Sequence, residues 1–531
     1  MAESGVGVHH RRRTETSLRS QQMDHQWAGR HGNAGCPRNT RGLCRTDRYS
    51  HIPRPPPRGW PRDGNALKDG RHMFRSWPDS LWLTERPDPP QSSVPDGSTA
   101  DVIIVGAGYT GLWSAIFVKE QRPDLDVVVI DAVAPGYGAS GRNGGWCSGL
   151  LPIDTASLIA LHGRDAALAM QRAAIASVTD VGRYVTENKI DCDWRLSGSV
   201  TAATNPAQLE RAKHAVAEAR AFGLSEQDLR VITESELQGR IRVHGSLGGT
   251  FTPHCAAVHP MKLVNGLTAR ARFLGVRFSL GLRVGTIDDT GISGDFGNTP
   301  IRLRAPWVVR ATEAFTPAIK GQRRHVVPLY SYMIATEPLS DDTWSDIGWV
   351  ARETLAEGRH MVTYAQRTAD GRIAFGGRGA GYRFASRIAS NFDVDPRVHD
   401  RIVESMHTLF PATRDSRVTH RWGGPLALPR DWHPSVTVDR TTRRIRAGGY
   451  VGDGVALAHL AGRTVAAAIT GVDSADLTLP IARHISRNWE PEPLRFIGIN
   501  SALRLPLMAD AIERRTRRPA RRTIALMNRT M

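Results

Sequence analysis

The chain has 531 residues, of which 40% are hydrophobic and 23% charged, so it is long enough for several domains and too apolar to be wholly disordered. Its five cysteines are too few for a disulfide framework, and neither C-x-x-C nor H-E-x-x-H occurs, so we expect no metal site and a reducing, cytoplasmic location.

The net charge of +18 is concentrated at the two ends of the chain. Residues 1–72 hold 14 basic and 6 acidic residues, and residues 501–531 hold 8 basic and 2 acidic residues. The 428 residues between them carry only +4. The body therefore gives no sign of a nucleic-acid surface, and no specific nucleic-acid partner is expected.

Residues 1–72 contain only six Leu, Ile, Val or Phe residues, too few to offset the entropy of ordering. We predict a disordered Arg/Pro-rich extension, or a start codon assigned too early with Met73 as the true beginning. No apolar stretch follows the arginines at 11–13, so a signal peptide is not predicted. The apolar run Val102–Val118 is short and contains three glycines, so no membrane span is expected.

From residue 101 the chain alternates between strand-like and helix-like segments. Val102–Val105 and Val127–Ile130 are β-branched runs typical of buried parallel strands, and Gly111–Gln121 between them is predicted to be a helix. Two further helices are expected at Leu209–Phe222 and Met261–Phe273.

Residues 325–378 have a different pattern, which predicts antiparallel strands at Val326–Thr336, Met361–Gln366 and Arg372–Phe375, with a hairpin turn at 369–371. Strand and helix patterns return at 436–470. We therefore predict an α/β nucleotide-binding domain interrupted by a mainly antiparallel second domain.

The sequence Gly-Ala-Gly-Tyr-Thr-Gly at 106–111 is a G-x-G-x-x-G motif between a predicted strand and a helix. Its glycines allow a tight turn, close approach to a pyrophosphate and close packing of the helix on the strand. Asp131 ends the next strand, where a carboxylate can accept hydrogen bonds from ribose hydroxyls and disfavours a 2′-phosphate. The motif indicates NAD or FAD rather than NADP.

Two later glycine-rich segments favour FAD. Residues 138–146 (GASGRNGGW) follow the second strand and place backbone close to a ligand. Residues 449–455 (GYVGDGV) precede a predicted helix, Ala456–Thr470, which Asp453 can cap and Gly471 can end. The N-terminus of that helix would stabilise negative charge on a reduced flavin. An NAD-dependent dehydrogenase would have no use for this loop.

Together these motifs resemble the D-amino-acid-oxidase-like (DAO) family of FAD-dependent oxidoreductases, with the γ-glutamylputrescine oxidase-like branch as the nearest likeness. The resemblance extends from about Met73 to about Arg518 and includes PLYSYMIATEPL (328–339), FGGRG (375–379) and NWEPEPLRFIG (488–498). It implies a Rossmann-type FAD domain built from discontinuous segments, a β-sheet substrate domain over the flavin, and oxidation of an amine.

The resemblance also implies the residues that contact FAD. They are Gly106, Ala107, Gly108, Tyr109, Thr110, Gly111, Asp131, Ser140, Gly141, Arg142, Asn143, Gly144, Gly145, Val284, Ala311, Thr312, Gly452, Asp453, Gly454 and Val455. Val284 is placed at the end of a strand predicted over Val276–Val284, and Ala311-Thr312 after a strand at Trp307–Arg310. No cysteine occurs at the 422–424 segment, where some relatives link the flavin, so FAD is expected to be non-covalent.

The substrate contacts are less constrained by the sequence. Tyr330 and Tyr332 alternate on the strand predicted to cover the flavin, Tyr364 lies on a neighbouring strand, and their aromatic rings suit an aliphatic amine. Arg378 could bind a substrate carboxylate. The alternative for the three tyrosines is packing within the sheet, and the alternative for Arg378 is a structural ion pair. No catalytic base is identifiable.

The predicted domain organisation alternates between the two domains. The segments are an extension at 1–72, an N-terminal arm at 73–100, FAD-domain segments at 101–180, 256–325 and 416–475, substrate-domain segments at 181–255 and 326–415, and a C-terminal helical, basic tail at 476–531.

The resemblance implies that a small amine gives a hydride to flavin N5, that the imine hydrolyses, and that O₂ reoxidises the flavin to give H₂O₂. One alternative is an amine dehydrogenase with another electron acceptor. The alternative from another class is an Arg-tailed protein that binds nucleic acid or an anionic surface and carries a vestigial flavin fold.

Overall fold

The computed structural model describes residues 77, 79–85, 94–377, 379 and 381–530, which belong to one compact unit spanning residues 66–531. The predicted extension at 1–72, Met73 and Arg378 lie outside the described residues. Among the described residues, no helix combines the length and the apolar composition that crossing a membrane requires.

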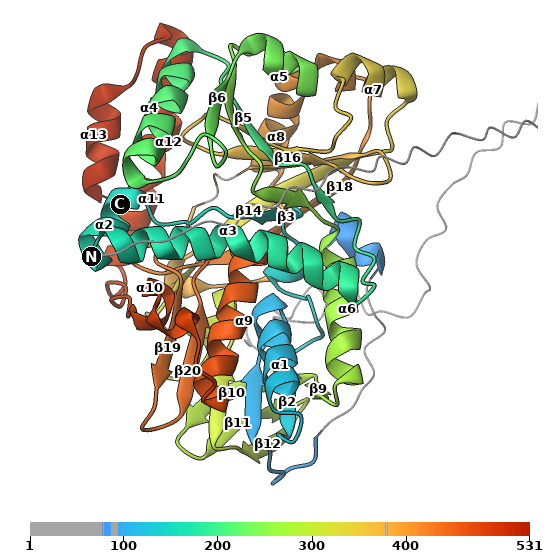
Figure 1. Cartoon of the computed structure of the whole chain (residues 1–531), viewed down its shortest axis with the longest axis vertical. Helices are drawn as coiled ribbons and strands as arrows, with labels where there is room; N and C mark the ends of the chain where they lie inside the picture. Colours follow the sequence, from blue (N-terminus) through green and yellow to red (C-terminus); the bar gives the residue numbers. More distant parts are fainter. Residues whose placement is uncertain (1–76, 78, 86–93, 378, 380, 531) are drawn as a thin grey trace, which may run out of the picture. The chain divides into compact units, whose positions relative to one another are not determined.

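A six-stranded sheet forms the predicted nucleotide-binding part (Figure 1). Its strands, in spatial order, are β19 (Ser435–Asp439), β20 (Arg444–Gly448), β13 (Trp307–Arg310), β1 (Val102–Val105), β2 (Val127–Asp131) and β9 (Arg277–Leu280). All neighbours are parallel except the edge pair β19–β20. The prediction of a parallel sheet from β-branched runs is confirmed, since β1 pairs in parallel with β13 and β2 and is buried along its whole length.

The larger sheet has eight strands and is antiparallel except for the β5–β15 pair. In spatial order these are β18 (Val418–Leu428), β14 (Val327–Thr336), β17 (Ile373–Gly377), β16 (Thr363–Arg367), β15 (Thr354–Glu357), β5 (Ser199–Ala202), β7 (Gly249–Thr252) and β6 (Arg230–Ile232). The three strands predicted between 325 and 378 are present. β18 pairs with β14 in this sheet, whereas the sequence predicts that residues 416–475 belong to the FAD domain.

The remaining strands form two small three-stranded sheets. One contains β10 (Leu282–Asp288), β11 (Gly291–Phe296) and β12 (Thr299–Arg304), and the other contains β3 (Trp146–Ser148), β8 (Cys255–Ala257) and β4 (Arg195–Leu196). The single strand predicted over Val276–Val284 is wrong, because Gly281 adopts φ 92° and turns the chain out of the six-stranded sheet. Val284 consequently lies within β10 rather than at a strand end.

The helices cover both large sheets. They are α1 (Tyr109–Gln121), α2 (Thr155–His162), α3 (Arg164–Glu187), α4 (Pro206–Phe222), α5 (Glu234–Arg240), α6 (Pro260–Phe273), α7 (Asp341–Ile347), α8 (Pro396–Leu409), α9 (Gly454–Thr470), α10 (Pro480–Arg483), α11 (Leu494–Ala502), α12 (Arg504–Thr516) and α13 (Arg521–Thr530). In Figure 1 the long helix α3 crosses between the elements of the six-stranded sheet below and those of the eight-stranded sheet above.

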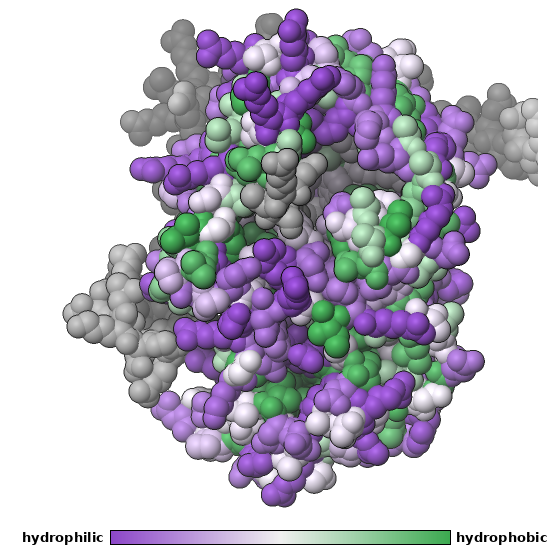
Figure 2. Space-filling view, turned by 90° about the vertical axis from the view of Figure 1, so that its left-hand side faces the viewer, coloured by the Kyte–Doolittle hydropathy of each residue, from purple (hydrophilic) through white to green (hydrophobic). Residues whose placement is uncertain are grey.

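Helices α1 and α9 pack unusually closely. A β-carbon on Gly462 of α9 would lie 2.5 Å from Cβ of Trp113 on α1, so only glycine allows this approach. The largest hydrophobic cluster surrounds these two helices. On the face drawn in Figure 2 the surface is mostly hydrophilic, with hydrophobic residues in small separate groups.

Candidate active site

The glycine motif forms the turn between β1 and α1, as predicted. Gly106 adopts φ 110°, and its N–H donates to the carbonyl of Ile130 at 2.7 Å. A β-carbon here would lie 2.3 Å from the carbonyl oxygen of Ala311, and one on Gly111 would lie 1.9 Å from the carbonyl oxygen of Gly106. Both positions therefore require glycine, because backbone packs against backbone.

Asp131 at the end of β2 holds this turn in place. One carboxylate oxygen accepts the N–H of Ala107 at 2.9 Å, and the other accepts the N–H of Val133 at 2.9 Å. Burial raises the pKa of the Asp131 carboxyl, and the backbone hydrogen bonds oppose that rise. The carboxylate therefore lies beside the turn, where the predicted ribose would be.

A first cavity of about 130 Å³ follows the turn. Nine of the predicted cofactor residues line it: Gly106, Gly108, Tyr109, Thr110, Asp131, Ser140, Val284, Ala311 and Thr312. Within its wall Ser140 Oγ accepts the N–H of Tyr109 at 2.9 Å, which joins the two glycine-rich loops. Ala107 and Gly111 are not among the lining residues and instead shape the turn.

The second glycine-rich loop is fixed by its own polar side chains. Asn143 Nδ2 donates to the carbonyl of Ser140 at 2.9 Å, and its Oδ1 accepts the N–H of Gly145 at 2.8 Å. The buried Arg142 donates to the carbonyl of Tyr137 at 2.8 Å and forms an ion pair with Asp393 at 3.0 Å. These two side chains therefore hold the loop in shape as well as lining the site.

A second cavity of about 590 Å³ continues from the first, and Ala139 lines both. Six predicted cofactor residues border it: Arg142, Asn143, Gly144, Gly452, Asp453 and Val455. The predicted Gly141, Gly145 and Gly454 pack just behind its wall, against Gly136, Gln366 and Tyr450 respectively.

Helix α9 begins at this cavity and ends at Gly471, whose φ of 76° gives the predicted glycine stop. Asp453 occupies the N-cap position, but its side chain makes no capping hydrogen bond, so the predicted cap is wrong. The N-terminus of a helix carries partial positive charge. The part of the cavity next to the N-terminus of α9 therefore favours a ligand group that develops negative charge.

The eight-stranded sheet forms another wall of the second cavity. On β14 it is Ser331 and Met333 that line the cavity, together with Tyr364 from β16, whose hydroxyl lies 2.9 Å from Ser331 Oγ. Tyr330 and Tyr332 belong to the hydrophobic cluster on the opposite face, and the Tyr332 hydroxyl donates to the carbonyl of Phe392 at 2.8 Å. The expectation that these two tyrosines cover the flavin is therefore wrong, because strand alternation turns them away.

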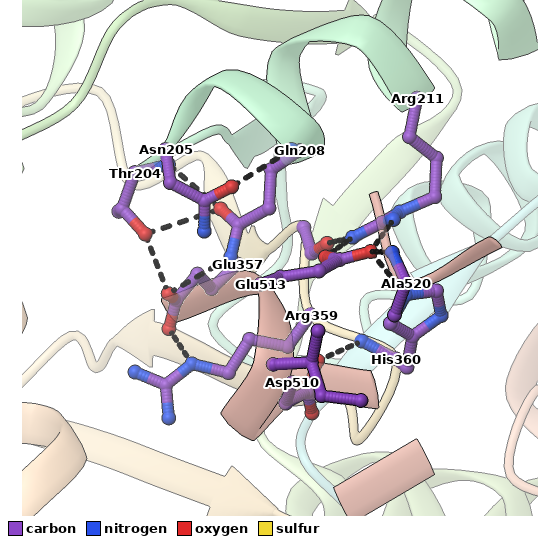
Figure 3. A network of polar contacts seen from close by, with 12 residues as sticks. Thr204, Asn205, Gln208, Arg211, Glu357, Arg359, His360, Asp510, Glu513 and Ala520 are labelled. Carbon is purple, nitrogen blue, oxygen red and sulfur yellow. Dashed lines mark hydrogen bonds and ion pairs between the residues drawn. The ribbon is translucent and has the colours of Figure 1, made fainter. Parts of the chain in front are cut away.

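The part of the cavity lined by α4 and β15 is polar (Figure 3). Glu357 is only 4% exposed; its Oε1 accepts the Thr204 hydroxyl at 2.8 Å and its Oε2 lies 2.5 Å from Nε of Arg359. Arg211 on α4 also lines the cavity and forms a bidentate pair with Glu513 on α12 at 3.0 and 3.1 Å. Segments about 300 residues apart in sequence thus meet here.

Sequence reasoning missed several residues of this cavity. Trp146 is the last residue of the glycine-rich segment 138–146, and its ring meets that of Tyr364 edge to face at 6.0 Å. Its position at the end of that segment is a usable sequence signal. Glu357 and Arg359 had none, because single charged residues in a strand and the following loop do not indicate a site.

The two joined cavities fit FAD. The first is walled by glycine backbone and a carboxylate, as a dinucleotide requires, and the second borders a helix N-terminus. Cys147, the cysteine nearest to the glycine loop in sequence, is fully buried on β3, and burial raises the pKa of its thiol well above the usual value. A reactive thiolate is therefore disfavoured there.

Comparison with known proteins supports FAD as the cofactor. The family model described as "FAD dependent oxidoreductase" (DAO) matches residues 101–468. The probable oxidoreductase OrdL of Rhizobium meliloti is 30% identical over 74% of this chain and 87% of its own length. The gamma-glutamylputrescine oxidoreductase of Escherichia coli is 26% identical over 72% of this chain and 86% of its own length.

Solved structures share the fold. The crystal structure of glycine oxidase from Geobacillus kaustophilus matches with a TM-score of 0.60 and 18% identity, covering 73% of this chain and all of that chain.

Proposed function

The chain belongs to the DAO family of FAD-dependent oxidoreductases, and from this premise we propose that it oxidises a C–N bond of a small amine or amino-acid-like substrate in the second cavity. The observation that carries the proposal is the joining of a glycine-walled dinucleotide cavity to a larger cavity with aromatic and apolar walls. The names of the relatives, among them a gamma-glutamylputrescine oxidoreductase, support an amine as the substrate class.

When bound, FAD supplies the hydride acceptor, without a covalent link to the protein. The residues proposed to hold it are those lining the first cavity together with the loops at 142–145 and 452–455. Asp131 is proposed to bind the ribose, and the N-terminus of α9 to favour negative charge at the flavin end.

The chain's own side chains are proposed to select and orient the amine. Tyr364 and Trp146 offer ring surfaces to an aliphatic chain, while Met333 and Leu426 keep the wall apolar. Desolvation in such a place favours the neutral amine, the form that can release a hydride from its α-carbon. The nitrogen lone pair then forms the C=N bond, a proton leaves, and the imine hydrolyses in water.

The polar part of the cavity is proposed to bind the far end of the substrate. Arg211 and Arg359 present guanidinium groups, and Glu357 a carboxylate, within one wall. A substrate with a polar or zwitterionic tail would be held there by charge-assisted hydrogen bonds. A plain alkylamine lacks those contacts and should bind more weakly.

Anaerobic mixing with a panel of amines tests the proposal. Primary and secondary aliphatic amines, γ-glutamylated diamines and amino acids are added to the yellow holoenzyme, and at least one should bleach the flavin band near ~450 nm. Reduction should accelerate as the pH rises towards the pKa of the substrate amine, because the neutral form reacts. Bleaching by a 2-hydroxy acid or NADH and by no amine would contradict the proposal.

Reoxidation distinguishes two versions of this function. We propose O₂ as the acceptor, in which case air restores the yellow colour and yields H₂O₂. Slow recovery in air with fast recovery in an artificial acceptor would instead indicate an amine dehydrogenase. Binding to nucleic acid or anionic vesicles at physiological salt, without any amine turnover, would favour the Arg-tailed binding protein.

A further inference from the structure

A third cavity, of about 150 Å³, borders the end of β20 and the start of the loop that precedes α9. Its wall combines Arg310 at the end of β13, Arg446 on β20 and His325 with the backbone of Gly448 and Gly449. Hydroxyl groups of Ser435, Thr437 and Ser486 and the carboxyl group of Glu313 also line it. Glu313 borders the first cavity as well, whereas none of the other residues named here lines the two cavities assigned to FAD and substrate.

The two arginines are forced together by the sheet. Arg310 and Arg446 are register partners on parallel strands, so their side chains project to the same face. Arg310 is only 8% exposed, and neither guanidinium forms an ion pair with a carboxylate in the described part of the chain. Two adjacent cations, one of them buried, are costly without a counter-charge.

The hydrogen bonds of Arg310 do not compensate for this charge. The Nη1 atom of Arg310 donates to Oε1 of Gln322 and lies 3.1 Å from Nδ1 of His325. Both of these partners are neutral. Among the residues that the structure describes, the buried Nε–H of Arg310 has no hydrogen-bond partner. Burial lowers the pKa of His325 to about 4, so this imidazole is neutral at pH 7.

The carboxyl group that lines this cavity is a poor counter-ion. Glu313 lines the same cavity, but burial raises its pKa to about 7, so it is only partly ionised at neutral pH. One of its oxygens is already engaged by the N–H of Gly449 at 2.8 Å. The cavity therefore holds excess positive charge.

We propose that this cavity binds a small tetrahedral oxyanion, of the phosphate or sulfate type, between Arg310 and Arg446. Its volume of about 150 Å³ leaves room for a central atom with four oxygens. Guanidinium forks and hydroxyl groups are the donors that such an anion requires.

An anion here would also stabilise the loop that leads to the cofactor. Gly448 and Gly449 line the anion cavity, and Gly452 and Asp453, a few residues later, line the second cavity. The bound anion would neutralise the arginine pair and hold the end of β20. The site is thus a means by which anion concentration can influence retention of FAD.

Isothermal titration calorimetry of the FAD-saturated protein tests the proposal. Phosphate, sulfate and glycerol phosphate are titrated at constant ionic strength, with chloride as the control anion. Saturating FAD prevents phosphate from entering a vacant cofactor site, and an unchanged flavin spectrum verifies that no FAD is displaced. Binding of glycerol phosphate in addition to phosphate would show that the site also accepts a phosphate monoester, whereas binding of phosphate and sulfate alone would restrict it to the free oxyanion.

Arg446→Gln should weaken phosphate binding about tenfold or more, because a charge-assisted contact is lost. The matched control is Arg440→Gln, which removes the same charge from the exposed turn between β19 and β20. Equal weakening by both variants would show non-specific attraction and overturn the proposal. Absence of saturable phosphate binding by the unsubstituted protein, with no rise in melting temperature, would overturn it without any variant.

Discussion

The ring of Tyr364 rests directly on the backbone of Gly144, since a β-carbon at position 144 would lie 2.6 Å from Cε2 of the tyrosine. On β17, a β-carbon at Gly376 would lie 2.4 Å from the same ring. The ring is therefore held between two glycines, one from the loop that lines the cofactor site and one from the sheet. This contact sets the position of an aromatic wall relative to the flavin loop.

Gly144→Ala should displace the Tyr364 ring and lower kcat/KM for an accepted amine by up to about 100-fold, because small misplacements in an active site are costly. The melting temperature should change much less than the activity. Gly239→Ala is the control, since a β-carbon on this glycine meets nothing within 4 Å. Full activity of Gly144→Ala would show that the ring's position is unimportant.

A pair of tyrosine variants tests which face of the sheet lines the cavity. Tyr332→Phe removes the part-buried hydrogen bond to the carbonyl of Phe392 and should lower the free energy of unfolding by about 1 kcal/mol while leaving KM unchanged. Tyr364→Phe removes the contact with Ser331 and should alter KM or kcat. Steady-state kinetics and denaturant unfolding measure both effects, and the reverse pattern would refute the assignment of faces.

Asp131→Ala should weaken FAD binding by about 1.5–3 kcal/mol, because a charged acceptor for hydrogen bonds is lost. The increase in flavin fluorescence as FAD dissociates on dilution measures the change in FAD affinity. Asp124→Ala is the control, because the side chain of Asp124 is 61% exposed and pairs with the nearby Arg122. Unaltered FAD affinity would mean that Asp131 serves only to hold the glycine turn.

The buried carboxyl of Glu313 should make stability depend on pH. Its pKa is raised to about 7 by burial, above the value of 4.5 for a free glutamate, so the folded state binds more protons between these values. By linkage, its contribution to stability is present below pH 4.5 and is lost as the pH rises through 7. Glu313→Gln removes this loss. The free energy of unfolding at pH 8, taken relative to that at pH 5, should therefore be higher in the variant than in the parent by up to about 3 kcal/mol.

Urea unfolding of both proteins at the two pH values gives that difference. Glu210→Gln, which alters an exposed carboxylate on α4, controls for the general effect of net charge. A Glu313→Gln protein with the same pH dependence as the parent would show that Glu313 is ionised throughout.

The sequence by itself determined the local units of this protein. β1, the glycine turn and α1 follow from a β-branched run, obligatory glycines and an apolar helix that are contiguous in the chain. The same holds for α4, α6 and α9, because helix periodicity and terminal signals depend on near neighbours. The parallel character of the first sheet followed from the uniform burial that such runs require.

Only the tertiary structure decided which side chains meet. Alternation along β14 separates Tyr330 and Tyr332 from Ser331 and Met333, but the sheet is covered on both faces, so the pattern did not say which face lines the cavity. The polar wall joins Arg211 to Glu513, and the anion cavity joins Arg310 to Arg446. Such pairs depend on strand order and helix docking, which arise from burial of the whole chain and leave no trace in the spacing of residues.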